Sequence, residues 1–207
     1  KLGLVIIDEQ HKFGVKQRIN FAKKGGSNCD VLLMSATPIP RTMMMSIYGD
    51  MDTSILMEKP IQRKTIVTLS KPENKIDDLW PFIKRKIAEK EQIFWVCPLI
   101  EDSSKLDFSS TAKLFKLLSK KFIKKVGIIH GALDLIEKEK VLKEFLNNKI
   151  SILVSTTVIE VGIDFPNATA IIIENANKFG LAQLHQLRGR IGRGEKPGTC
   201  ILLFKNQ

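Results

Sequence analysis

Ile93-Phe94-Trp95-Val96 is one of eight short apolar runs whose spacing decides the fold. These runs are apolar on both faces, as expected for strands of a parallel sheet that is covered by helices. Amphipathic stretches of helical period lie between several of them. Strands that alternate with helices predict an α/β fold, with parallel sheets flanked by helices. The other expected strands are residues 4–7, 31–34, 65–67, 126–129, 152–154, 170–173 and 200–203, and the expected helices are residues 74–90, 110–122 and 134–147.

A polar stretch around Pro60 interrupts this series, and we interpret residues 59–64 as a linker. Residues 1–58 then hold two expected strands, which are too few for a stable sheet. Residues 65–207 hold about six, enough for a complete sheet. Because the chain starts directly before a strand, we expect residues 1–58 to be the C-terminal half of a domain and residues 65–207 to be a whole one.

The composition favours a polyanionic partner. The chain of 207 residues has 33 Lys and Arg against 22 Asp and Glu, a net charge of +11. Nucleic acid is the first candidate for such a basic chain, although a Lys-rich bias that only aids solubility is an open alternative. The basic residues 113–125 could form a membrane-surface helix, but their apolar positions favour a core-packed helix with a solvated lysine face.

The cysteines and the hydropathy pattern point to the cytoplasm. Cys29, Cys97 and Cys200 lie far apart without metal-ligand spacing, which fits a reducing compartment. No apolar stretch approaches the roughly 18 residues of a membrane span, and no signal-peptide pattern is present. We therefore expect no membrane partner.

Asp8-Glu9-Gln10-His11 follows the first expected strand. The carboxyl end of a buried strand is where open α/β sheets bind ligands. Asp8 is suited to hold Mg²⁺ through water, because a hard cation prefers carboxylate oxygen. Glu9 is then placed to orient and deprotonate an attacking water. A polar turn after a strand is the alternative.

Ser35-Ala36-Thr37-Pro38 follows the second expected strand. Thr37 can cap a helix that Pro38 begins, and this structural role explains both residues. It does not explain why Ser35 and Thr37 both emerge at the sheet edge where Asp8 is expected. A functional role at that edge therefore stays open beside the capping role.

Three weaker patterns end strands of the second block. His130-Gly131 precedes an expected capping box of Asp134 and Glu137, and a helix N-terminus behind a glycine can bind phosphate. Ser155-Thr156-Thr157 offers three hydroxyl groups that suit DNA phosphates. Asp164 ends the apolar segment that follows. An ordinary strand-to-helix turn explains the His130-Gly131 pattern equally well, and each of the three patterns is weak alone.

Gln186-Leu187-Arg188-Gly189-Arg190-Ile191-Gly192-Arg193-Gly194 is the strongest signal. If the stretch is helical, Gln186, Arg190 and Arg193 share one face at i, i+4 and i+7. Each interior glycine would cost about 1 kcal/mol relative to alanine, which makes sense if the backbone must approach a neighbour closely. Arginines aimed at a γ-phosphate stabilise transition-state charge. A basic surface helix is the alternative.

Taken in order, these motifs resemble motifs II, III, V and VI of superfamily 2 helicases. The wider context, including Val96-Cys97-Pro98, Ile173-Glu174-Asn175 and residues 179–186, resembles the RecG-like helicases that act on branched DNA. The related transcription-repair coupling translocases usually carry Glu at the position of Gln10, so RecG is the better match. The resemblance covers nearly the whole chain.

The resemblance implies two RecA-like domains that bind ATP and Mg²⁺ between them. Asp8 and Glu9 would act on Mg²⁺ and water, and Arg190 and Arg193 on the γ-phosphate. Residues near the nucleotide or coupling it to DNA would be Gln10, His11, Ser35, Thr37, Asp164 and Gln186. Residues toward the DNA would be His130, Gly131, Thr156 and Thr157.

The sequence also departs from the family pattern. No G-x-x-x-x-G-K-[ST] occurs, so the loop that cradles the phosphates is missing. Ala132 stands where relatives commonly carry a basic side chain. We therefore expect a monomeric motor for forked or branched duplex DNA in recombination and repair, inactive without the N-terminal half of the same helicase. The alternative is a non-catalytic DNA-binding or partner module from a split or truncated helicase gene.

Overall fold

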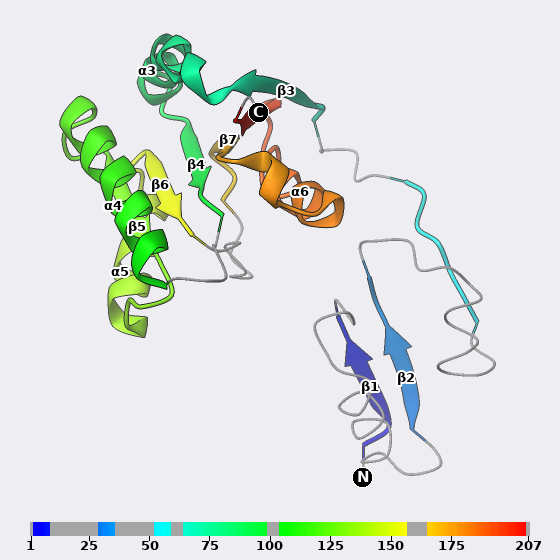
Figure 1. The fold of residues 1–207 in the computed structure, drawn as a ribbon. Coiled ribbons are helices and arrows are strands. Elements are labelled where there is room, and N and C mark those ends of the chain that lie inside the picture. The colour runs from blue at the N-terminus through cyan, green and yellow to red at the C-terminus, as the bar shows by residue number, and fades with distance from the viewer. Residues whose placement is uncertain are drawn as a thin grey trace. The chain divides into compact units, whose positions relative to one another are not determined.

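The computed structural model describes residues 2–8, 29–35, 52–58, 64–98, 104–156 and 165–205, with only the backbone of residues 104–110. The chain divides into two compact units, Lys1–Met57 and Glu58–Gln207. Both contain parallel strands (Figure 1). Within the described ranges, no helix combines the length and apolarity needed to span a bilayer.

The first unit contains a two-stranded parallel sheet of β1 (Leu4–Ile7) and β2 (Asp30–Leu33). Ile7 pairs with Leu33, and the Met34 amide extends the ladder by donating to the Ile7 carbonyl at 2.8 Å. The Ile7 side chain is buried, but Ile6, on the opposite face of its strand, is 56% exposed. One face of this sheet is therefore apolar and open to solvent.

The second unit is built on six parallel strands in the order β3-β8-β7-β4-β6-β5. The strands are β3 (Ile66–Pro72), β4 (Gln92–Val96), β5 (Val126–Ile129), β6 (Ile152–Ser155), β7 (Ala168–Ile173) and β8 (Gly198–Phe204). The helices are η2 (Glu73–Leu79), α3 (Trp80–Ala88), α4 (Ser104–Lys121), α5 (Leu135–Leu146), η3 (Ala176–Lys178) and α6 (Leu181–Arg188).

Alternating side chains of the central strands fill two separate cores. Ile93, Trp95 and Cys97 point to one face, where they meet apolar residues of α3 and α4 such as Ile83 and Leu118. Phe94 and Val96 point to the other face, among apolar residues of α5 and α6 that include Phe145 and Leu187. Every described position of β4, β6 and β7 is buried, as a sheet covered on both faces requires.

The α/β class expected from the sequence is confirmed. All eight expected strands are present, and the three expected helical stretches correspond to η2 with α3, to α4 and to α5. The largest difference among the strands is β3, which continues to Pro72 because it pairs with β8 along seven positions. The interpretation of residues 59–64 as a linker stays a prediction, since residues 59–63 lie outside the described ranges.

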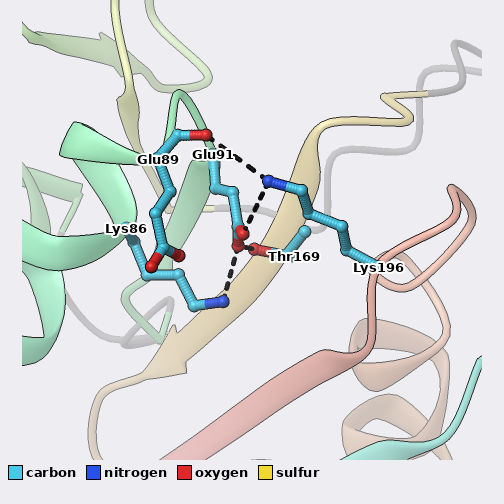
Figure 2. A network of polar contacts seen from close by, with 5 residues as sticks. All are labelled: Lys86, Glu89, Glu91, Thr169 and Lys196. Carbon is cyan, nitrogen blue, oxygen red and sulfur yellow. Dashed lines mark hydrogen bonds and ion pairs between the residues drawn. The ribbon is translucent and has the colours of Figure 1, made fainter.

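A buried carboxylate joins four segments at the amino end of this sheet (Figure 2). Glu91, directly before β4, is 5% exposed and accepts from Lys86 of α3 at 2.5 Å. It also accepts from the Thr169 hydroxyl of β7 and, at 3.0 Å, from Lys196, which follows α6. Burial opposes ionisation of Glu91, but the hydrogen bonds from Lys86, Thr169 and Lys196 outweigh it and lower the pKa to about 2. We call these four residues the Glu91 cluster.

The lowered pKa predicts how the Glu91 cluster contributes to stability. An ionised Glu91 stabilises the fold fully above its unfolded pKa of about 4.5, and this contribution is lost as the pH falls toward 2. At pH 7 we expect Glu91→Gln to lower the free energy of unfolding by about 3 kcal/mol, because two lysines lose their common partner. Urea unfolding between pH 3 and pH 7 should show the difference shrinking below pH 4.5.

Glu139→Gln is the matched control, because Glu139 forms an exposed ion pair with Lys143 at 3.7 Å. It should change the free energy of unfolding by less than about 0.5 kcal/mol. A deficit of Glu91→Gln that stayed constant down to pH 3 would contradict the assignment of the stability to the ionised carboxylate.

Candidate functional site

Asp8 and Ser35 lie at the same edge of the two-stranded sheet. Asp8 follows β1 directly, and Ser35 comes two residues after the end of β2. The register pairs Ile7 with Leu33, so both residues leave the sheet at its carboxyl end. Both are exposed. Carboxylate and hydroxyl oxygens at such an edge suit a hydrated Mg²⁺. Among the residues that the structure describes, no three His, Cys, Asp or Glu side chains gather as a metal site.

His130, Gly131 and Thr156 lie together at the carboxyl end of β5 and β6. Ile129 pairs with Ser155 across these strands, and the Thr156 amide donates to the Ile129 carbonyl at 3.4 Å. His130 is half-buried and Gly131 is exposed, whereas Thr156 is 5% exposed. The two strand ends that were expected to face DNA are therefore neighbours, although the Thr156 side chain offers little surface to a ligand.

The start of α5 lies next to this edge. The Glu137 amide donates to the Asp134 carboxylate at 2.7 Å, so Asp134 caps the helix as the sequence predicted. The Lys138 ammonium donates to the Gly131 carbonyl at 3.3 Å. A capped helix start, a glycine and a lysine thus lie close to one another, but the Asp134 carboxylate already accepts from the Glu137 amide of this helix start.

Glu174 directly follows β7 and is bonded to residues of the core. Its carboxylate accepts from the Trp95 indole at 3.1 Å and from the Cys97 thiol at 3.7 Å. Burial raises the pKa of Glu174, with a smaller opposing effect of the Trp95 hydrogen bond. Burial also raises the pKa of Cys97 well above its usual range. These contacts link the ends of β4 and β7 within the sheet.

The expectation that Gln186, Arg190 and Arg193 share one helical face is wrong. α6 ends at Arg188, and Gly189 is its C-cap. Gly192 has a φ of +67°, a left-handed conformation that interrupts a helix and suits glycine. Residues 189–197 therefore form a loop that joins α6 to β8, and we call them the arginine loop. Gln186 is half-buried on α6 itself.

Close backbone contacts fix the arginine loop to the sheet. Ile191 is fully buried, and the Gly192 amide donates to the Ala168 carbonyl of β7 at 3.3 Å. A Cβ at Gly192 would lie 3.2 Å from Ile66, and one at Gly194 only 2.4 Å from the Pro166 carbonyl oxygen. Gly192 thus permits the close approach that the sequence suggested for Gly189 and Gly192, but in a loop and not in a helix. The tighter contact at Gly194 was not predicted.

Arg190 and Arg193 are both half-buried at this loop. The Arg193 Nε donates to the Gly189 carbonyl at 3.2 Å. Both arginines border a pocket whose remaining lining is apolar, namely Phe94, Val96, Phe165, Ile171 and Leu187. Apolar walls reduce the screening of a guanidinium charge and so strengthen its attraction for an anion. The loop lies at the amino ends of β7 and β8, on the sheet edge opposite to His130 and Thr156.

Several predicted site residues lie outside the described ranges: Glu9, Gln10, His11, Thr37, Thr157 and Asp164. Conversely, the sequence reasoning missed the Glu91 cluster, which contacts the arginine loop through Lys196. Its members come from separate parts of the chain, and Lys196 follows Glu91 by 105 positions. The sequence feature that could have indicated this cluster is Glu91, a charged residue directly before the strand β4, which is apolar on both faces.

The model of the helicase conserved C-terminal domain matches residues 74–195, a span that includes Arg190 and Arg193. The chain therefore belongs to this family of helicase domains. Solved structures agree on the fold: Saccharomyces cerevisiae Dbp5 bound to RNA and ADP BeF3 has a TM-score of 0.69 at 19% identity, covering 100% of this chain and 55% of that one.

The chain is also similar to one particular helicase, RecG. It is 48% identical over 204 residues to the ATP-dependent DNA helicase RecG of Thermotoga maritima and to that of Bacillus subtilis. These alignments cover 98% of this chain but only 26% and 30% of the relatives. A structure of RecG bound to a three-way DNA junction has a TM-score of 0.75 at 43% identity, with 100% of this chain and 26% of that one covered.

The tight packing of Gly194 predicts the effect of a single methyl group. Gly194→Ala would push its Cβ into the Pro166 carbonyl, so the arginine loop or its neighbour must move. We expect the free energy of unfolding to fall by about 1–3 kcal/mol, as is usual for an overpacked site. Thermal and urea unfolding measure this directly.

Gly131→Ala is the control, since nothing lies within 4 Å of a Cβ at Gly131. It should leave stability within about 0.5 kcal/mol of the unchanged chain. Equal stabilities for Gly194→Ala and Gly131→Ala would show that the loop is not packed as described.

Proposed function

We propose that this chain is part of the motor of an ATP-dependent DNA helicase that remodels branched DNA, such as replication forks and Holliday junctions. The observation that carries the proposal is the 48% identity to RecG over 98% of the chain. The chain spans about a quarter to a third of these relatives, so the remaining parts of such a motor are to be sought outside these 207 residues. The net charge of +11 suits a DNA partner in the cytoplasm.

In this proposal Asp8 and Glu9 serve the nucleotide. Asp8 would hold Mg²⁺ through water and Glu9 would take a proton from the attacking water. The exposed carboxylate of Asp8 beside Ser35 is chemically suited to the ion, because both offer hard oxygen ligands. When bound, Mg²⁺ supplies charge neutralisation at the phosphates. Gln10, His11, Ser35, Thr37, Asp164 and Gln186 would couple nucleotide state to DNA.

Arg190 and Arg193 would stabilise the charge that develops on the transferred phosphoryl group. Two half-buried guanidinium groups beside an apolar pocket support this role, because a weakly solvated cation attracts an anion more strongly. The short backbone attachments of the arginine loop also support it, because they hold the groups before a ligand arrives. His130, Gly131, Thr156 and Thr157 would lie toward the DNA.

The test replaces Arg193 and Arg190 by Ala in the longest polypeptide that the gene encodes. We expect DNA-stimulated ATP hydrolysis to lose about 10³-fold or more in kcat, because arginines of this kind contribute about 10³–10⁵-fold. Affinity for a three-way DNA junction should change little. Arg85→Ala is the control, since Arg85 is exposed on α3 and should leave kcat unchanged. Unaltered kcat in both Arg190→Ala and Arg193→Ala would refute the proposal.

A second experiment measures ATP hydrolysis by the 207 residues alone. They carry no G-x-x-x-x-G-K-[ST] motif, so we expect no DNA-stimulated ATP turnover from this segment. Robust turnover by the purified segment would contradict the proposed division of the nucleotide site.

A further inference from the structure

Lys196 attaches the arginine loop to the sheet three residues after Arg193. Its ammonium donates to Glu91 Oε1 at 3.0 Å and to the Glu89 carbonyl at 3.4 Å. Glu89 and Glu91 lie between α3 and β4, so the contact crosses from one connection to another (Figure 2). The Lys196 side chain is 54% exposed, whereas that of Glu91 is 6% exposed. Lys196, a largely exposed lysine, thus forms an ion pair with the buried carboxylate of Glu91.

Neutralising Glu91 does not require Lys196. Lys86 Nζ already lies 2.5 Å from Glu91 Oε2, with a side chain that is only 11% exposed, and the Thr169 hydroxyl donates to the same oxygen. These contacts orient the carboxylate and leave Oε1 directed at Lys196, as Figure 2 shows. The ion pair between Lys196 and Glu91 is therefore not needed for neutralisation. Its structural consequence is to connect the arginine loop to α3, β4 and β7.

The loop is attached on both sides of Arg193. Before it, the Gly192 amide is bonded to Ala168, the first residue of β7. After it, Lys196 reaches Glu91, which is bonded to Thr169, the second residue of β7. Between these points Gly194 packs against Pro166. The segment from Gly192 to Lys196 is thereby fixed at both ends to the start of one buried strand.

We propose that Lys196, held by the Glu91 cluster, is a positioning residue for Arg193. The proposal rests on the proposed function, in which Arg193 acts on the γ-phosphate. A displacement of about 1 Å in a group that stabilises a transition state can cost about 10²-fold in rate. Loss of the Lys196 attachment frees one end of a short segment, so we expect Lys196→Met to lower kcat for ATP about 10-fold or more. KM for ATP and affinity for DNA should stay within twofold.

The experiment is a double-mutant cycle in the longest polypeptide that the gene encodes, assayed well below every variant's melting temperature. The variants are Lys196→Met, Arg193→Ala and the pair together. If Lys196 acts through Arg193, Lys196→Met has no further effect on kcat once Arg193 is Ala. Lys196→Arg keeps the charge at a half-exposed position and should restore most of kcat. Should Lys196→Met not fold, Lys196→Gln replaces it with the same expected loss of kcat, because its shorter, uncharged side chain cannot form the ion pair with Glu91.

Lys143→Met is the matched control. It removes a lysine from an ion pair too, but that pair with Glu139 is exposed and remote in sequence from the arginine loop. It should leave kcat unchanged.

Each outcome separates this inference from the function on which it rests. Wild-type kcat in Lys196→Met, with kcat lost in Arg193→Ala, overturns the positioning role and leaves the proposed function standing. The positioning role is also overturned if Lys196→Met lowers kcat by the same factor in the wild-type and the Arg193→Ala backgrounds, because Lys196 would then act independently of Arg193. Wild-type kcat in Arg193→Ala overturns the proposed function itself.

Discussion

The parallel pairing of six strands around the buried strands β4 and β7 is the constraint on which the second unit depends. Because all these strands run in one direction, every connection must return from the carboxyl edge of the sheet to the amino edge. Residues that follow strands, such as His130, Thr156 and Glu174, therefore collect at one edge. Residues that precede strands, such as Glu91 and Lys196, collect at the other, where the arginine loop lies.

The arginine loop shows how this constraint shapes a candidate site. It must turn from the end of α6 into β8 within nine residues, while Ile191 stays in the core. Gly192 supplies the left-handed backbone of the turn, and Gly194 lets the chain pass directly over Pro166. The loop places its two arginines beside an apolar pocket, so in the proposed function little ordering would be required for an anion to bind.

Most of the second unit's fold could be predicted from the sequence, because residues such as Ile93, Phe94 and Val96 are apolar on both faces of a strand. The helical reading of residues 186–193 failed because periodicity of arginines says nothing about the backbone that carries them. Gly189 and Gly192 are poor helix residues, and here the backbone geometry outweighs the spacing. The glycine cost that the sequence analysis assigned to close approach in a helix in fact marks the end of the helix at Gly189.

The candidate site was predictable only in part. Asp8 and Ser35 could be placed at one sheet edge because parallel strands share their carboxyl ends. The Glu91 cluster could not, since an ion pair between Glu91 and Lys196 depends on strand order, and no local pattern specifies that β7 lies between β4 and β8. Strand order therefore decides which charged residues meet at the amino edge.

Both proposals require the arginine loop to be held in place before any ligand binds. ¹⁵N relaxation of the 207-residue chain measures this most directly, through the backbone order parameters of Arg190, Gly192 and Arg193. We expect order parameters of about 0.85, equal to those of β7 and β8. Values below about 0.6 at these three amides, with β7 and β8 rigid, would contradict it.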